Sequence, residues 1–195
     1  EYIIRNGGCT KGDLYRLALE NRLKPYEYPV TKAYEMMSFF EGVLAYYEAT
    51  REEECFCVVE NFVSAVRESE ITVIGGAGCT HELFDHSAVK QTEYSETIMQ
   101  ETCVTVTWMR LNDRMLRLTG DAKYADAVER SAYNALLGSI NVEWNKQYSF
   151  EKKSLVEALP FDSYSPLYAN RRGRGVGGYK EFSEGGYYGC CACIG

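Results

Sequence analysis

Two stretches of the chain share one layout, a helix with one apolar face, a tight turn and a second such helix. Apolar residues at helical spacing predict the first pair of helices over residues 31–49 and 52–67, with Thr31 as the N-cap of the first. The second pair is predicted over residues 103–118 and 124–137, on either side of a turn at Gly120. Repeated helical hairpins stack side by side because each buries its apolar face against the next. The repeat therefore predicts an all-α chain of αα-hairpins, as a helical toroid or an α-solenoid.

The segments around the hairpins are rich in glycine. Residues 71–82 lie between the two predicted hairpins and contain Gly75, Gly76 and Gly78. Glycines at this density indicate unusual backbone angles or a close approach of two segments. Residues 141–189 are polar and irregular, and we expect a long loop region there.

The size of the chain allows one domain with a substantial core. It begins at Glu1 without a Met and stops directly after a group of cysteines, so both ends look cut. We therefore expect residues 1–195 to form a single partial domain that lacks N- and C-terminal parts of the same polypeptide.

Charge and hydropathy exclude two classes of partner. The net charge of −7 argues against nucleic acid, because phosphate backbones attract concentrated Lys and Arg. The basic stretch 171–174 lies among glycines and is predicted to be a solvated loop. No run of about 20 apolar residues exists, so no membrane span is expected. Because no targeting signal is present, the sequence leaves the cytoplasm and the periplasm equally open.

Three thiols and one carboxylate, from two distant segments, form a candidate metal site. Glu101 and Cys103 stand at the start of a predicted helix, and Cys190 and Cys191 are adjacent. Zinc prefers four such ligands. On a regular helix Glu101 and Cys103 would point about 200° apart, so both can reach one ion only if Glu101 precedes the helix. The alternative is that these are buried, inert cysteines, which is common for free thiols.

Glu82 is the candidate acid/base. It follows the glycine-rich segment and His81, and a carboxyl group in a rigid loop can be positioned for proton transfer. A solvated carboxylate, or a residue of a helical first turn, is the alternative for Glu82. Glu93 and Glu96 are weaker rivals.

Four motifs in order resemble those of the β-L-arabinofuranosidase-type glycoside hydrolases of family 127 and their relatives, over about residues 30–193. The motifs are Gly75-Gly76-Ala77-Gly78 followed by Glu82; Glu101-Thr102-Cys103; Thr119-Gly120-Asp121-Ala122-Lys123-Tyr124-Ala125-Asp126 with Glu129-Arg130 and Tyr133-Asn134; and Cys190-Cys191.

The resemblance implies part of an (α/α)₆ barrel, so that residues 1–195 would be a partial catalytic domain. It implies a retaining exo-hydrolase that acts on β-L-arabinofuranosyl groups of plant glycans. It also implies a zinc ion and assigns roles to five residues of the motifs. The implied zinc ligands are Glu101, Cys103, Cys190 and Cys191, the implied nucleophile is Cys190, and the implied acid/base is Glu82.

The chain also departs from the family pattern. The stretch from Glu82 to Glu101 is a few residues longer, and Lys32 stands where a sugar-binding His is expected. Two other functions fit the residues, a non-catalytic helical-repeat binding module without metal, and a toroidal enzyme that uses carboxylates only, with Glu82 or Asp85 essential. We expect the isolated 195 residues to be inactive or poorly folded, because an open toroid leaves apolar helix faces exposed.

Overall fold

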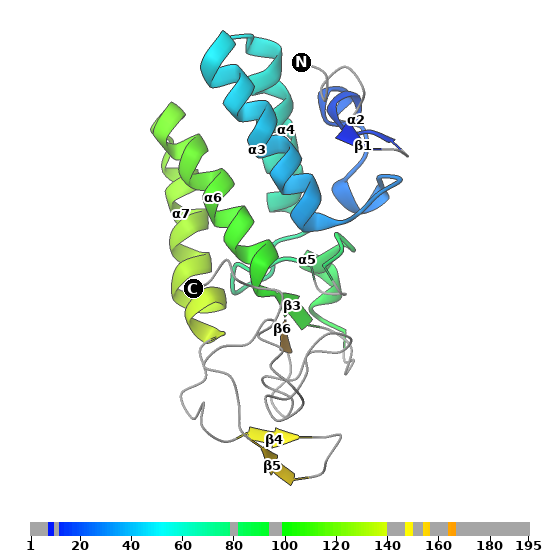
Figure 1. Ribbon diagram of the computed structural model, residues 1–195, viewed down its shortest axis with the longest axis vertical. Helices are drawn as coiled ribbons and strands as arrows, with labels where there is room; N and C mark the ends of the chain where they lie inside the picture. The colour runs from blue at the N-terminus through cyan, green and yellow to red at the C-terminus, as the bar shows by residue number, and fades with distance from the viewer. Residues whose placement is uncertain are drawn as a thin grey trace.

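The computed structural model describes most of the first 139 residues and three short strands beyond them (Figure 1). The described residues are 8–9, 12–78, 82–93, 99–139, 147–149, 154–156 and 164–166. Among them, no helix is both long enough and apolar enough to cross a membrane.

Both predicted hairpins are present. In the first, α3 (Ala33–Thr50) is followed by α4 (Glu53–Ser69), and the turn between them places Arg51 in the left-handed region with φ 62°. In the second, α6 (Thr102–Thr119) ends at Gly120 with φ 70°. These left-handed residues end each first helix abruptly, so the chain can turn back at once.

The last helix of the second hairpin changes its winding. It runs as α7 (Ala122–Arg130) and continues into η2 (Ser131–Leu136), which is a π-helix. A π-helix is rare, and single π-helical turns within α-helices are frequent at functional sites.

The two hairpins lie side by side, and α3 and α6 both begin at the end of the bundle where β3 and α5 lie (Figure 1). Apolar side chains of α3, α4 and α6 form one continuous core. Within it the rings of Phe40 and Phe62 stack with centroids 3.8 Å apart. Arg110 of α6 also donates a hydrogen bond of 2.8 Å to the Glu41 carboxylate of α3, so that the first helices of the two hairpins are joined by charge as well as by packing.

A short N-terminal segment packs against α4. Strands β1 (Gly8–Cys9) and β2 (Gly12–Asp13) pair antiparallel, and α2 (Leu14–Glu20) follows them. The Asp13 carboxylate accepts a hydrogen bond of 2.9 Å from the Arg16 amide and so caps α2. A 3₁₀ turn, η1 (Pro25–Glu27), leads on to α3.

The remaining elements are short. Helix α5 (Ser87–Lys90) comes between the two hairpins in the sequence. Strand β3 (Met99–Glu101) pairs antiparallel with β6 (Tyr164–Pro166). Strands β4 (Gln147–Ser149) and β5 (Ser154–Val156) pair with each other. Three short strands thus fall within residues 141–189, which the sequence predicts to be loop, and the rest of that region lies outside the described residues.

Candidate functional site

The glycine-rich segment is fixed by close contacts. Both the amide and the hydroxyl of Thr72 donate to the Gly76 carbonyl, at 2.9 and 3.0 Å. The Ser131 hydroxyl donates to the Gly75 carbonyl at 2.7 Å. A Cβ atom at Gly75 would lie 2.8 Å from the Ser131 backbone, and one at Gly76 would overlap the Gln100 side chain. These glycines are therefore required for the loop to reach η2 and β3.

The segment ends against the first turn of α6. Gly78 has φ +75°, and a Cβ atom there would contact Val104 at 3.6 Å and the Leu83 carbonyl at 3.5 Å. Glu82, four residues later, also has a positive φ of 69°. A left-handed backbone is uncommon for a residue other than glycine, and it indicates a position that its surroundings hold in place.

The backbone around Glu82 is bound to the start of α3. The Ala33 amide donates to the Glu82 carbonyl at 2.8 Å, and the Phe84 amide donates to the Thr31 carbonyl at 2.7 Å. Lys32 and Leu83 form the antiparallel bridge between these two hydrogen bonds. Lys32 is consequently the N-cap of α3 in place of the predicted Thr31, since the Thr31 carbonyl already serves the bridge.

The side chains across this bridge form an ion pair. The Lys32 ammonium donates a hydrogen bond to the Glu82 carboxylate, and both side chains remain partly exposed, at 45% and 27%. The hydrogen bond that Lys32 donates to Glu82 is the main cause of a raised Lys32 pKa, and the charges of Glu82, Glu35 and Glu101 raise it further. Two of the predicted site carboxylates, Glu82 and Glu101, thus act on one ammonium group.

Glu101 and Cys103 lie where the metal hypothesis requires. Glu101 is the last residue of β3 and the N-cap of α6, with extended backbone angles (φ −85°, ψ 127°). Cys103 lies in the first turn of α6. Both residues are buried, at 3% and 4% exposure. Because Glu101 precedes the helix, it need not point away from Cys103.

The donor chemistry of this pair suits zinc. A carboxylate and a thiol that are both buried at the start of one helix are costly to ionise without a cation beside them, and zinc takes both as ligands. Cys190 and Cys191 lie outside the described residues. Within the described part of the chain, no group of three or more His, Cys, Asp or Glu side chains is arranged to hold a metal. The four-ligand set therefore stays a prediction, with two of its members placed.

Glu70 is a buried acid that sequence reasoning missed. It is fully buried beyond the end of α4, and its carboxylate accepts hydrogen bonds from the Asp85 amide at 3.1 Å and the Ser87 amide at 3.2 Å. Burial raises its pKa to about 7. Glu70 therefore fixes the segment directly after Glu82. In the sequence it is one more acid at a helix end, and nothing distinguishes it from its exposed neighbour Glu68.

Other polar residues near Glu82 have structural partners. Asp85, the alternative essential acid, accepts from the Ser87 hydroxyl at 2.7 Å and pairs with Lys90 at 3.1 Å. The imidazole of His86 stacks on Tyr26 with ring centroids 4.5 Å apart. His81 lies outside the described residues, as does Glu96, whereas Glu93 is exposed.

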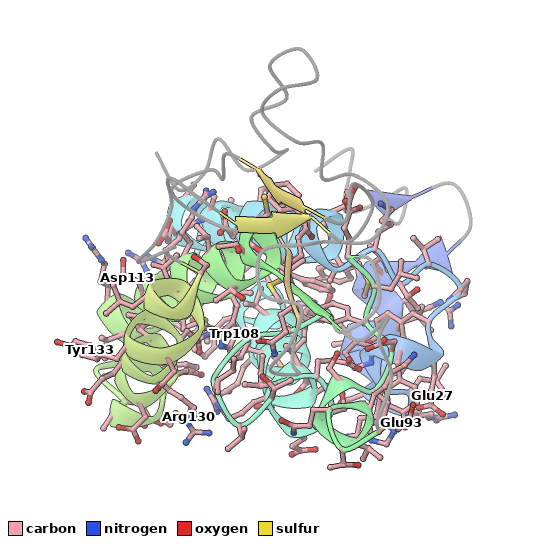
Figure 2. All side chains as sticks on the ribbon, turned by 90° about the horizontal axis from the view of Figure 1, so that it is seen from below. Glu27, Glu93, Trp108, Asp113, Arg130 and Tyr133 are labelled. Carbon is pink, nitrogen blue, oxygen red and sulfur yellow. The ribbon has the colours of Figure 1, made fainter. Side chains whose placement is uncertain are left out.

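A cavity of about 150 Å³ lies elsewhere, among residues of α4, α6 and α7. Trp108 and Arg130, both labelled in Figure 2, are among the residues that line it. Glu82, Glu101 and Cys103 do not line this cavity. The candidate site is the junction of the α3 start, the Glu82 segment and the α6 start, partly exposed at Lys32 and Glu82 and buried at Glu101 and Cys103.

Three solved structures have similar folds. A GH127 β-arabinofuranosidase matches with a TM-score of 0.65 and 20% identity, over 99% of this chain and 26% of its own. A structure described as a glycoside hydrolase matches with a TM-score of 0.62 and 19% identity, over 98% and 31%. A GH127 β-L-arabinofuranosidase from Geobacillus stearothermophilus T6 matches with a TM-score of 0.50 and 22% identity, over 60% and 18%.

These similarities confirm the fold prediction, an all-α chain that is part of a helical toroid. The chain spans between 18% and 31% of the length of the structures that it matches. No curated protein matches it. The family profile described as "Beta-L-arabinofuranosidase, GH127 catalytic domain" matches residues 22–152, which is more than half of the chain. The chain therefore belongs to the GH127 β-L-arabinofuranosidase catalytic-domain family.

Proposed function

We propose that the chain is part of the catalytic domain of a retaining glycoside hydrolase that acts on β-L-arabinofuranosides or a related plant-type glycan. The observation that carries the proposal is the family match, which includes the segments of Glu82, Glu101 and Cys103. The ion pair of Glu82 with Lys32 supports it, because the charge of the buried Glu101 also acts on this ammonium and so links two acids from separate segments.

Glu82 would be the acid/base. In the first step its carboxyl group gives a proton to the departing glycosidic oxygen, and in the second its carboxylate takes a proton from the attacking water. Such a group needs access to substrate and a fixed direction. The 27% exposure of its side chain gives the access, and the bridge to α3 gives the direction.

Cys190 would be the nucleophile. Its sulfur would bond to the anomeric carbon as the bond to the leaving oxygen breaks, and water would later replace the sulfur at that carbon. Glu101, Cys103, Cys190 and Cys191 would hold a zinc ion. When bound, zinc lowers the pKa of a ligating thiol far below about 8.5 and so supplies a thiolate at neutral pH.

The test uses a longer polypeptide that contains this chain and has about the length of the solved relatives. We expect about one zinc ion per molecule by elemental analysis, since all four implied ligands are used. We expect Cys190→Ser to lower kcat on an aryl β-L-arabinofuranoside at least about 1,000-fold, because the nucleophile is lost.

Cys57→Ser is the matched control, because Cys57 is an exposed free thiol of α4. It should leave both the zinc content and kcat unchanged. A zinc-free protein in which Cys190→Ser binds glycan normally would show a binding module, and a zinc-free enzyme with unchanged turnover in Cys190→Ser would show carboxylate-only catalysis.

A further inference from the structure

We infer that Lys32 is a positioning residue, whose ammonium group fixes the direction of the Glu82 carboxyl group and balances the negative charge around it. The inference rests on the proposed function of Glu82 as acid/base. It also changes the expected role of Lys32, which stands where the resemblance places a sugar-binding His: here the side chain is directed to another protein side chain.

The backbone geometry holds Lys32 and Glu82 in register. The two residues are 50 positions apart in the sequence, and the bridge between Lys32 and Leu83 joins their segments through hydrogen bonds at residues 31, 33, 82 and 84. Directly after Lys32, α3 enters the core with Ala33, which is fully buried. Lys32 therefore projects from a rigid base, as a residue that positions another must.

The Glu82 segment is equally constrained on its other side. Phe84 is buried against Phe62 of α4, with ring centroids 6.1 Å apart. Glu70 accepts the amide hydrogen bonds of the next turn of this segment. These contacts hold the backbone, and the ammonium of Lys32 binds the Glu82 side chain.

The ammonium of Lys32 also supplies positive charge beside the Glu82 carboxylate. The hydrogen bond to Glu82, followed by the charges of Glu82, Glu35 and Glu101, raises the Lys32 pKa, so Lys32 stays charged. Without this ammonium the Glu82 side chain would lose the charge-assisted hydrogen bond of the ion pair.

Substrates with different leaving groups separate this role from a purely structural one. An alkyl β-L-arabinofuranoside needs its leaving oxygen protonated, whereas a para-nitrophenyl one leaves without much help. If Lys32 positions the acid, Lys32→Met should lower kcat/KM, which reports the first step, at least about 10-fold on the alkyl substrate and less than about 3-fold on the aryl one, since acid catalysis of that step matters far more for the alkyl leaving group.

Three further variants complete the experiment, in the same full-length polypeptide. Glu82→Gln should show the same selectivity with a larger loss on the alkyl substrate. Lys32→Arg, which keeps a cation, should recover part of the rate. Glu35→Gln is the matched control, because Glu35 is exposed and faces Lys32 electrostatically without being assigned a catalytic role; it should change kcat less than about 2-fold on either substrate.

Combining Lys32→Met with Glu82→Gln gives the decisive result. If Lys32 acts through Glu82, the double variant should be no slower than Glu82→Gln alone. Equal losses on both substrates in Lys32→Met, or additive losses in a double variant that melts at the wild-type temperature, would overturn the inference alone. If Glu82→Gln itself showed no selectivity, the acid/base assignment would fail and the inference with it.

Discussion

The helices of this chain begin in two different ways. Helices α2 and α7 start at Asp13 and Asp121, whose carboxylates accept hydrogen bonds from the first turn. Helices α3 and α6 start at Lys32 and Glu101, whose side chains make no such cap. An Asp, Asn or Ser at these two positions would stabilise the helix ends more.

At α3 and α6 the lack of a side-chain cap coincides with the candidate site. These two helices begin at the same end of the bundle (Figure 1), and Lys32 and Glu101 belong to the site. Helix α4 also begins without a side-chain cap, at Glu52, but at the other end of the bundle. An uncapped start is therefore informative only together with its place in the fold, because sequences usually depart from the locally stable choice at functional sites.

The largest effect should come from the body of a hairpin. Among the described residues Trp108 is the largest fully buried side chain, and it lies in the middle of α6. Trp108→Ala should lower the free energy of unfolding by about 3–5 kcal/mol, measured by urea denaturation, because it leaves a cavity in the core. A loss below about 1 kcal/mol would show that the core around Trp108 is weakly packed. The stability of the helix starts could then not be compared on the assumption of a rigid hairpin.

A second effect concerns the buried acid beside the site. Burial raises the pKa of Glu70 from 4.5 to about 7 in the folded chain. The protonated form is thus favoured by folding, so its contribution is complete below pH 4.5 and is lost as the pH rises through 7. The shift corresponds to about 3 kcal/mol.

Thermal melting between pH 4.5 and 8 tests this effect. The wild-type chain should lose stability over that range relative to Glu70→Gln, which does not titrate. Glu68→Gln is the control, since Glu68 is exposed at the same end of α4. Parallel melting curves for wild type and Glu70→Gln across the range would contradict a neutralised buried acid.

The smallest effects address the helix starts directly. Asp13→Ala should lower the free energy of unfolding by about 1 kcal/mol and leave turnover unchanged, because it removes a cap and a weak exposed ion pair with Arg16. Glu101→Ser should do the opposite, with stability of the metal-free chain equal or up to about 1 kcal/mol higher, and with zinc content lost. The comparison would be wrong if Glu101→Ser destabilised the chain and kept its zinc.

Much of the fold could be predicted from the sequence. Apolar periodicity and the turn residues located both hairpins, because a helix with one apolar face has a distinct pattern. The expected position of Glu101 ahead of its helix is confirmed. The predicted N-cap at Thr31 is wrong, because the start of α3 depends on the bridge between Lys32 and Leu83, which no local sequence pattern indicates.

The candidate site could be predicted only in part. The resemblance singled out Glu82, Glu101 and Cys103, and the structure places all three. Local sequence patterns do not indicate contacts between distant segments. The ion pair of Lys32 with Glu82 and the hydrogen bonds that Glu70 accepts were therefore not predicted. The roles of Cys190 and Cys191 stay predictions.

The glycine-rich segment has one more consequence, for how this site can vary. At Gly75 and Gly76 the backbone of the loop touches Ser131 of η2 and Gln100 of β3 with no side chain between them. Any added carbon would act as a wedge, and the wedge would push on the loop that leads to Glu82. The position of Glu82 therefore depends on the absence of side chains at Gly75 and Gly76. Under the proposed function, we expect changes of specificity to arise at exposed positions such as Lys32 before they arise in this loop.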